Sequence, residues 1–346
     1  MPVWELNQDL KIRLNLSALA LSVIEQDRLT FRAKSRTSFL NQVFLNAYLH
    51  SGASIAQALA RKEQEYTNIL ESPLVGSSYR DATVKLLLNH EREALVKRQS
   101  AYEKAHAPFL HTLSDAVAET LNSDSVRQES KYYSIAQYFR GVIEDYCRMP
   151  MIEREAVYFR EHFDRIQQAI ASAVQLEITS FSNTRYLVHP YQVLKDPVCT
   201  AHYLACYGRT SQQTIRQKMP QSFRIANIKQ IRLTNVPAFI SKADRESLDS
   251  LIQEQGVQFL TGQTKEIQVR LTLQGIRKLN RHSTLRPVCV AQTPDGVFTF
   301  RCTETQAEYY FLKLGADAEI LMPARLRRKF KRMHEQAAAN YNTEKD

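Results

Sequence analysis

The stretch KIRLNLS, residues Lys11–Ser17, decides the fold of the N-terminal part of the chain. Its apolar residues Ile12, Leu14 and Leu16 alternate with polar ones. Alternation at a period of two predicts a strand with one buried face. A single short strand cannot bury that face alone, so we expect a partner strand elsewhere in the sequence.

Two short helices are predicted to follow this strand. Helical spacing runs from Ser17 to about Arg28, with apolar residues on one face at Leu19, Val23 and Ile24. Ser35 then stands where an N-cap is expected, because its hydroxyl can accept a hydrogen bond from the first helical turn. The helix after Ser35 carries its apolar residues at Phe39, Leu40, Val43, Phe44, Ala47 and Tyr48.

A strand followed by two short helices resembles the ribbon-helix-helix family. In that family two antiparallel strands lie in the major groove of DNA, and their outward polar residues contact base edges. The resemblance implies that Lys11, Arg13 and Asn15 occupy those positions, and these residue types suit guanine and adenine edges.

An internal repeat can supply the second strand. The segments LSALALSVIEQD and LSDAVAETLNSD are similar, which aligns Ser17 with Ser114, and further on Ser35 aligns with Ser134. We therefore expect a strand around residues 109–113 that pairs antiparallel with the first, in an intramolecular pseudo-dimer. This second strand alternates poorly and is less basic, which weakens the prediction of sequence-specific DNA binding. The alternative is two unrelated helix pairs.

The pattern changes along the chain in a way that predicts an α+β protein. Apolar residues at helical spacing predict a mostly helical region at 1–150 and a connecting helix at 151–175. Short β-prone runs broken by Pro, Asn and Gly predict a sheet at 176–240. Helix and strand signals alternate in the C-terminal zone, 241–346.

The β-rich zone resembles the WYL domain, a small and strongly bent sheet related to Sm-like folds. The runs LEITSF, TRYLVHPYQVLKD, HYLACYGR and FRIANIKQIRL follow the order of that family. The Trp-Tyr-Leu motif matches His202, Tyr203 and Leu204, with His in place of Trp. Ala226 and Asn227 stand where family members carry Asp and a second Arg, so part of the usual polar pocket is missing.

The WYL resemblance implies a site for nucleic acid or a nucleotide-like effector. Arginine forks bind phosphate, aromatic rings stack on bases, and histidine exchanges protons near neutral pH. The candidate residues are Arg185, His189, Tyr191, His202, Tyr203, Arg209 and Arg224. A role in the sheet core, or as solvated arginines, is the alternative, and the core is the favoured place for Leu204.

The C-terminal zone ends in a basic helix. The run EIQVRLTLQGIRKL predicts a strand at 267–273 and a helix that starts after Gly275. The next helix precedes a turn at Gly315, a strand at 318–322 and Pro323 at a helix start. This order resembles the C-terminal extension of WYL proteins, which implies an α/β dimerisation-type domain and a homodimer. Candidates for phosphate contact are Arg325, Arg327, Arg328, Lys331 and Arg332; a solvated basic helix is the alternative.

Composition bounds the classes of function. Lys and Arg (46) outnumber Asp and Glu (36), for a formal net charge of +10, which favours a polyanionic partner over simple solubility. We see no apolar signal region and no apolar run of about 18 residues, so we expect a cytoplasmic protein without a membrane partner. The five cysteines form no CxxC pair, so we expect no disulfide framework and no metal site, and most of them to be core residues.

Catalytic signatures are lacking in the sequence. The motifs GxxxxGK[ST], GxSxG and GxGxxG do not occur, and no paired metal-carboxylate spacing stands out. We therefore expect no enzyme, no catalytic residues and no cofactor. A nuclease with an unrecognised site is the alternative.

The whole layout resembles two groups of WYL proteins. The motifs SxxxFLxxVFxxAY, YYSIAQYFRGVIEDY and YYFLKLG are similar to the accessory proteins of RNA-targeting type VI-D CRISPR systems. That resemblance, which we favour, implies binding of single-stranded RNA and modulation of a CRISPR effector. The other group is ligand-responsive transcriptional regulators that bind operator DNA. A purely protein-binding adaptor is a third class.

Overall fold

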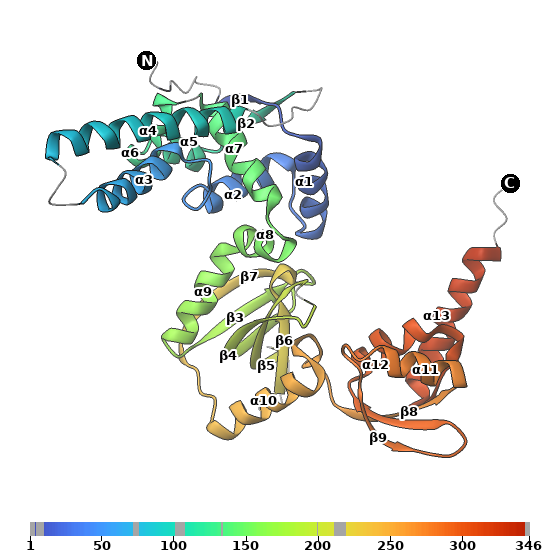
Figure 1. The fold of residues 1–346 in the computed structure, drawn as a ribbon. Helices are drawn as coiled ribbons and strands as arrows, with labels where there is room; N and C mark the ends of the chain where they lie inside the picture. Colours follow the sequence, from blue (N-terminus) through green and yellow to red (C-terminus); the bar gives the residue numbers. More distant parts are fainter. Residues whose placement is uncertain are drawn as a thin grey trace. The chain divides into compact units, whose positions relative to one another are not determined.

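The computed structural model (Figure 1) divides into two compact units, Met1–Arg160 and Glu161–Asp346. Every strand pair among the described residues is antiparallel, and the chain contains both helices and sheets, so it is a mixed α+β protein. The structure describes residues 4, 10–71, 76–100, 108–132, 134–198, 200–210 and 219–342.

The first unit repeats a strand and two main helices. The first copy is β1 (Lys11–Leu14), α1 (Ala18–Thr30) and α2 (Arg36–Ala47). The second is β2 (Phe109–Thr112), α5 (Asp115–Asn122), the short α6 (Asp124–Arg127) and α7 (Ile135–Arg148). A helical hairpin, α3 (Ile55–Ile69) and α4 (Ser77–Ser100), stands between the copies, and α8 (Met151–Tyr158) follows them.

The two copies meet through their strands. β1 runs antiparallel to β2, with Ile12 opposite His111 and Leu14 opposite Phe109, which is the pairing that the internal repeat predicts. The aligned serines have equivalent places as well, because each caps a helix by accepting a backbone N–H from the first turn. These caps are Ser17 of α1, Ser35 of α2, Ser114 of α5 and Ser134 of α7.

Helices of both copies share one core. The ring of Phe44 in α2 stacks on Phe139 in α7, with 4.7 Å between centroids. From α1 the inward residues are Ala20 and Ile24, both fully buried, whereas Leu19 is 63% exposed. The prediction that Leu19 belongs to the buried face is therefore wrong. The cap at residue 17 fixes the start of α1, and the inward stripe then follows positions 20, 24 and 27.

The predicted connecting helix at 151–175 is two helices followed by the start of a strand. α8 ends before Phe159, whose backbone leaves the helical region at φ −95° and ψ 23°. The Phe159 ring is buried edge-on against Phe31, and this packing accompanies the break. α9 (Arg160–Ala171) follows, and strand β3 already begins at Val174, after a left-handed residue, Ala173.

A five-stranded sheet forms the first part of the second unit. Its strands are β3 (Val174–Ser180), β4 (Arg185–Lys195), β5 (His202–Thr210), β6 (Met219–Arg224) and β7 (Ile228–Pro237), in the order β6-β5-β4-β3-β7. The two edge strands, β6 and β7, are separated by a three-residue 3₁₀ turn, which can span at most about 14 Å. A flat five-stranded sheet would place its edges about 19 Å apart. The sheet must therefore bend strongly, as the WYL resemblance implies.

Helix α10 (Lys242–Gln255) covers part of one face of this sheet. Its Leu248 packs with Ala205 and Tyr207 of β5, and with Val257 and Leu260 from the segment after the helix. The opposite face buries Leu176 and Val188, which lie opposite each other in register.

The C-terminal zone is a second, four-stranded sheet with helices on one face. Its order, β11-β8-β10-β9, with helices after the first and third strands, is a ferredoxin-like arrangement. Because all its pairs are antiparallel, the predicted α/β class is wrong for this zone. The elements are β8 (Lys265–Leu271), α11 (Leu273–Arg281), β9 (Val288–Gln292), β10 (Val297–Cys302), α12 (Glu304–Phe311), β11 (Ala318–Met322) and α13 (Ala324–Asn342).

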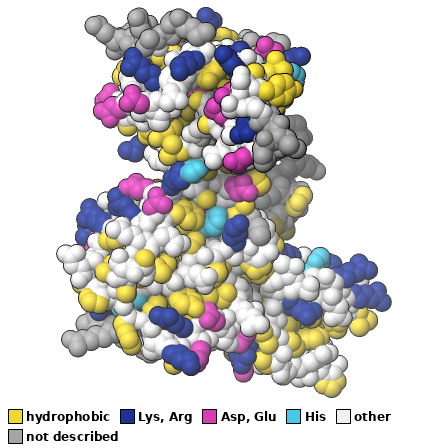
Figure 2. All heavy atoms as spheres, turned by 60° about the vertical axis from the view of Figure 1, so that its left-hand side comes forward, with side chains coloured by type: hydrophobic (Ala, Val, Ile, Leu, Met, Phe, Trp, Pro, Cys, Tyr) yellow, Lys and Arg dark blue, Asp and Glu magenta, His cyan; other side chains and the backbone are white. Residues whose placement is uncertain are grey.

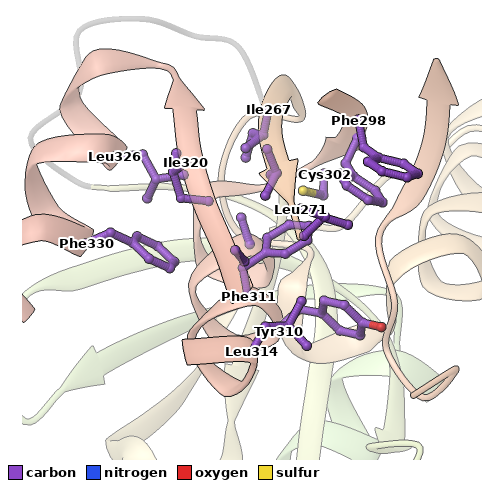
Figure 3. Close-up of a cluster of buried hydrophobic side chains, with 14 of the residues drawn as sticks. Ile267, Leu271, Phe298, Cys302, Tyr310, Phe311, Leu314, Ile320, Leu326 and Phe330 are labelled. Atoms are coloured by element: carbon purple, nitrogen blue, oxygen red, sulfur yellow. The ribbon is translucent and has the colours of Figure 1, made fainter. Parts of the chain in front are cut away.

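Aromatic and aliphatic side chains fill the space between this sheet and its helices (Figure 3). Phe298 and Phe300 come from β10, Phe311 from α12, and Leu326 and Phe330 from α13. The turn at Gly315, at φ +60°, and the strand 318–322 are as predicted. The strand predicted at 267–273 ends earlier, because Thr272 caps α11, and Gly275 lies inside that helix.

Three of the described cysteines, Cys147, Cys206 and Cys302, are buried core residues, as expected, whereas Cys289 is exposed. Cys199 lies outside the described residues.

Candidate nucleic-acid interface

Lys and Arg side chains are spread over the face of the molecule drawn in Figure 2 rather than confined to one patch. Surface charge alone therefore does not locate a site. Strand register and ion pairing locate candidate sites, because they show which cations share a face and which are already neutralised by carboxylates.

The two strands of the β1–β2 ribbon expose different kinds of side chain. Lys11 and Arg13 are exposed on β1, and they lie opposite Thr112 and Leu110 of β2. Both basic side chains on this face thus come from the first copy, and the second contributes a hydroxyl and an exposed leucine. Asn15 lies beyond the end of β1 and is half-buried, with Oδ1 buried and without a hydrogen-bond partner among the described residues. The prediction of an outward base-reading Asn15 does not fit that position.

His111 of β2 points the other way, into the core. Its Nε2 lies 3.1 Å from Oδ1 of Asn41, whose amide nitrogen donates to the carbonyl of Thr112. That arrangement makes Nε2 the donor. Burial lowers the pKa of His111 to about 4, so the ring is neutral at pH 7 and serves the packing of α2 on the ribbon.

Register places three arginines on one face of the five-stranded sheet. Residues that lie directly opposite each other in antiparallel strands share a face. Arg209 lies opposite Leu187, Leu187 opposite Glu177, and Glu177 opposite Arg232. This row crosses β5, β4, β3 and β7 and spans about 14 Å, at about 4.8 Å per strand.

Arg185 joins the same face, because it lies two residues before Leu187 on β4 and opposite Thr179. We call Arg185, Arg209 and Arg232 the arginine face. Arg185 and Arg232 are exposed and Arg209 is half-buried. None of the three forms an ion pair with a carboxylate of a described residue. Arg232 was not predicted as a site residue; the alternation of IKQIRL, which puts it outward beside buried Ile231, is the signal that could have found it.

The other predicted WYL residues lie elsewhere. Tyr203 and Arg224 oppose each other at the far end of β5, six residues, or about 20 Å, from Arg209. Tyr203 and Tyr191 pack against the cluster beneath α10. The hydroxyl of Tyr191 also donates to the carboxylate of Asp249, at 2.9 and 3.0 Å, so this ring is held in place by the helix.

Both predicted histidines are buried. His189 is 7% exposed, and its Nδ1 accepts the backbone N–H of Phe239 at 3.0 Å. His202 is 8% exposed, lies opposite Lys195 and meets the ring of Phe163 from α9 edge-on, 5.0 Å between centroids. Neither ring is on the surface that a ligand reaches, so the prediction of ligand contact does not fit them.

The basic helix α13 buries Leu326 and Phe330 and exposes its cations. Among them, Arg327 pairs with Glu319 of β11 at 2.6 Å, and Lys331 lies 3.7 Å from Glu335. The remaining predicted residues of this helix are Arg325, Arg328 and Arg332, all exposed and all lining one cleft.

Metal and membrane sites are not found in the described part of the chain. No group of three or more His, Cys, Asp or Glu side chains there could hold a metal ion. No described helix is long and apolar enough to cross a membrane.

Comparison with known proteins gives a likeness of fold. No protein-family model and no curated protein matches the chain. A solved structure described as a CRISPR Cas-related protein matches with a TM-score of 0.70 at 19% identity, over 100% of both chains. This likeness shows the fold. Proteasome accessory factor B/C of Arthrobacter aurescens aligns with 73% of this chain and 36% of its own, at 16% identity and a TM-score of 0.33.

Proposed function

We propose that this chain is a non-enzymatic regulator that binds single-stranded RNA through the arginine face and modulates a CRISPR RNA-targeting effector. The observation that carries the proposal is the set Arg185, Arg209 and Arg232, three guanidinium groups on one sheet face without a carboxylate partner among the described residues. Guanidinium groups without a carboxylate partner gain from phosphate contact, because each can donate two parallel hydrogen bonds.

A sheet face suits a single strand better than a duplex. The arginines spread over about 14 Å, which lets a flexible backbone follow them from phosphate to phosphate. Phe181, in the turn between β3 and β4, is 36% exposed and lies two residues beyond Thr179, which offers a ring for stacking a base. Glu177 and Thr179 on the same face can bond to a ribose 2′-hydroxyl, the group that distinguishes RNA from DNA.

The effector part of the proposal has two supports. One is the likeness of fold, over the full length, to a CRISPR Cas-related protein. The other is the resemblance of the sequence motifs to the accessory proteins of type VI-D systems. Membership of the WYL and ribbon-helix-helix families, a cytoplasmic homodimer, and response to a nucleotide-like effector belong to the same proposal.

A ligand-responsive DNA-binding transcriptional regulator is the second candidate. The antiparallel ribbon favours it, because exposed Lys11 and Arg13 on a two-stranded ribbon suit the major groove. The unequal partner strand, with Leu110 and Thr112 opposite, leaves this ribbon with two cations on a single strand.

The test is fluorescence anisotropy with labelled single-stranded RNA, single-stranded DNA and duplex DNA of one sequence, each at two salt concentrations. We expect the tightest binding to single-stranded RNA, with a loss of affinity at higher salt as phosphate contacts are screened. Tighter binding to the duplex would favour the regulator of transcription. Cleavage of the RNA in the presence of Mg²⁺ would contradict a non-enzymatic role.

A further inference from the structure

A second basic site lies in the ferredoxin-like part of the chain, between α12 and α13. Leu326 and Phe330 anchor α13 in the core, and this fixes the helix so that one side of it faces α12. The resulting cleft has a volume of about 430 Å³, with Leu326 at its apolar wall. Its charged lining is Glu304, Glu308, Arg325, Arg328, Lys329 and Arg332.

Part of this lining is already neutralised. Lys329 Nζ lies 2.6 Å from both carboxylate oxygens of Glu308. Glu304 lies 3.0 Å from Lys265 and 3.9 Å from the 85% exposed Arg325. Each of the two glutamates is thus engaged with at least one basic side chain.

Arg328 and Arg332 are left uncompensated. Neither has a carboxylate within ion-pair distance among the described residues. They lie one helical turn apart, which puts their Cβ atoms about 5–6 Å from each other, and like charges at this spacing repel. On the neighbouring stripe of the same helix, about 100° around its axis, Arg327 and Lys331 both have carboxylate partners. The helix therefore has one stripe whose cations have carboxylate partners and, next to it, one stripe with two guanidinium groups that have none among the described residues.

We propose that this cleft binds a nucleotide phosphate, held between the forks of Arg328 and Arg332. An anion placed between the two groups removes their repulsion and accepts paired hydrogen bonds from each. The volume is within the range of small-molecule sites, about 300–1,000 Å³, and exceeds what a single phosphate fills. The carboxylates of Glu304 and Glu308 on the opposite wall accept hydrogen bonds from a ribose or an amino group.

The phosphate can come from a free nucleotide or from an RNA chain, and the chemistry of the cleft is the same for both. This site is on a different sheet from the arginine face, so it does not depend on RNA binding by that face, although a free nucleotide bound here would be the nucleotide-like effector of the function proposed above. A negative result for the cleft does not contradict RNA binding by the arginine face, and a negative result for the arginine face does not contradict phosphate binding by the cleft.

The experiment uses the full chain and two probes, ATP by titration calorimetry and a short labelled oligoadenylate by fluorescence anisotropy. The test variant is Arg328→Gln with Arg332→Gln. The matched control is Arg327→Gln with Lys331→Gln, which removes the same charge from the neighbouring stripe of the same helix, where both cations have carboxylate partners. A further pair, Arg328→Lys with Arg332→Lys, keeps the charge and removes the forks, and it replaces the glutamine pair if that pair does not fold.

We expect the test variant to lose about tenfold or more in affinity for at least one probe, and the control to stay within about twofold. Loss for ATP alone identifies a free nucleotide, and loss for the oligoadenylate alone identifies an RNA phosphate. The lysine pair should fall between the parent and the glutamine pair. Equal losses in test and control variants, unchanged affinity in the test variant, or no binding of either probe by the parent would overturn the proposal.

Discussion

The carboxylate of Glu144 accepts hydrogen bonds from both the backbone N–H and the hydroxyl of Ser17, at 2.6 and 2.7 Å. Ser17 caps α1 of the first copy, whereas Glu144 belongs to α7 of the second, and both side chains are buried. A carboxylate at a helix N-terminus satisfies an N–H that has no partner within the helix. One residue of the second copy thus completes the start of a helix in the first.

Replacing that carboxylate should destabilise the first unit. We expect Glu144→Ala to lower the free energy of unfolding by about 2–3 kcal/mol, because it leaves two buried donors unsatisfied. Trp4, the one tryptophan of the chain, packs against Tyr138 of α7 and reports this transition by fluorescence in urea. The exposed Glu93→Ala on α4 should change the same transition by less than about 0.5 kcal/mol. Equal shifts in both variants would show that the link between the copies contributes nothing.

The buried His111 should make the first unit less stable in mild acid. Burial holds its folded pKa at about 4, below the unfolded value of 6.5. As the pH falls, the unfolded chain takes up the proton first, so stability present above pH 6.5 is lost towards pH 4. Between pH 7.5 and pH 5 the loss is about 2 kcal/mol.

His111→Gln keeps a donor for Asn41 and removes the titration. Its urea midpoint, followed by Trp4 fluorescence, should therefore depend less on pH than that of the parent. The same pH dependence in both proteins would contradict the assignment of this effect to His111.

Gly275 in α11 has no room for a side chain. A Cβ there would come within 2.3 Å of the carbonyl oxygen of Asp317. We expect Gly275→Ala to destabilise the C-terminal sheet by about 1–3 kcal/mol, because the backbone of α11 and the backbone at Asp317 must move apart to make room for the methyl group. Gly76, where a Cβ meets nothing within 4 Å, is the control, and Gly76→Ala should leave the melting temperature nearly unchanged. An equal melting temperature for the two variants would contradict the close approach.

Local signals in the sequence predicted the elements of the first unit well. Ser17 and Ser114 each cap a helix, and the strands before them pair. The sequence predicts these features because helix capping and strand alternation depend on residues that are neighbours in the chain. The break at Phe159 was missed, since it coincides with an aromatic contact to Phe31, far away in the sequence.

The candidate site could be predicted only in part, for a similar reason. Residue type predicts Arg185 and Arg209 as phosphate ligands, and strand register shows that they share a face with Arg232. Register depends on pairing between distant strands, which composition and spacing do not reveal. Motif similarity predicts His189 and His202 as ligand contacts, but a motif does not distinguish a buried ring from an exposed one, and both rings are buried.

Variants of the β1–β2 ribbon and variants of the arginine face should weaken the binding of different nucleic acids. We expect Lys11→Gln with Arg13→Gln to leave the affinity for single-stranded RNA within about twofold of the parent. The same variant should weaken duplex DNA binding, because about two phosphate or base contacts are lost. Anisotropy with both ligands checks this, and a large loss for single-stranded RNA would place the ribbon, not the sheet, at the RNA site.

The most direct test of the central claim compares two triple variants for binding of single-stranded RNA. One is Arg185→Gln, Arg209→Gln and Arg232→Gln. The other is Lys85→Gln, Lys242→Gln and Arg277→Gln, three exposed cations elsewhere, so that both variants lose the same net charge. The RNA affinity of each is measured by anisotropy over a series of salt concentrations.

We predict that the arginine-face variant loses about a hundredfold in RNA affinity. The slope of its log affinity against log salt concentration should become shallower by an amount that corresponds to about two to three phosphate contacts. The control variant should lose less than about threefold and keep the salt dependence of the parent. Equal behaviour of the two variants would contradict the assignment of RNA binding to Arg185, Arg209 and Arg232.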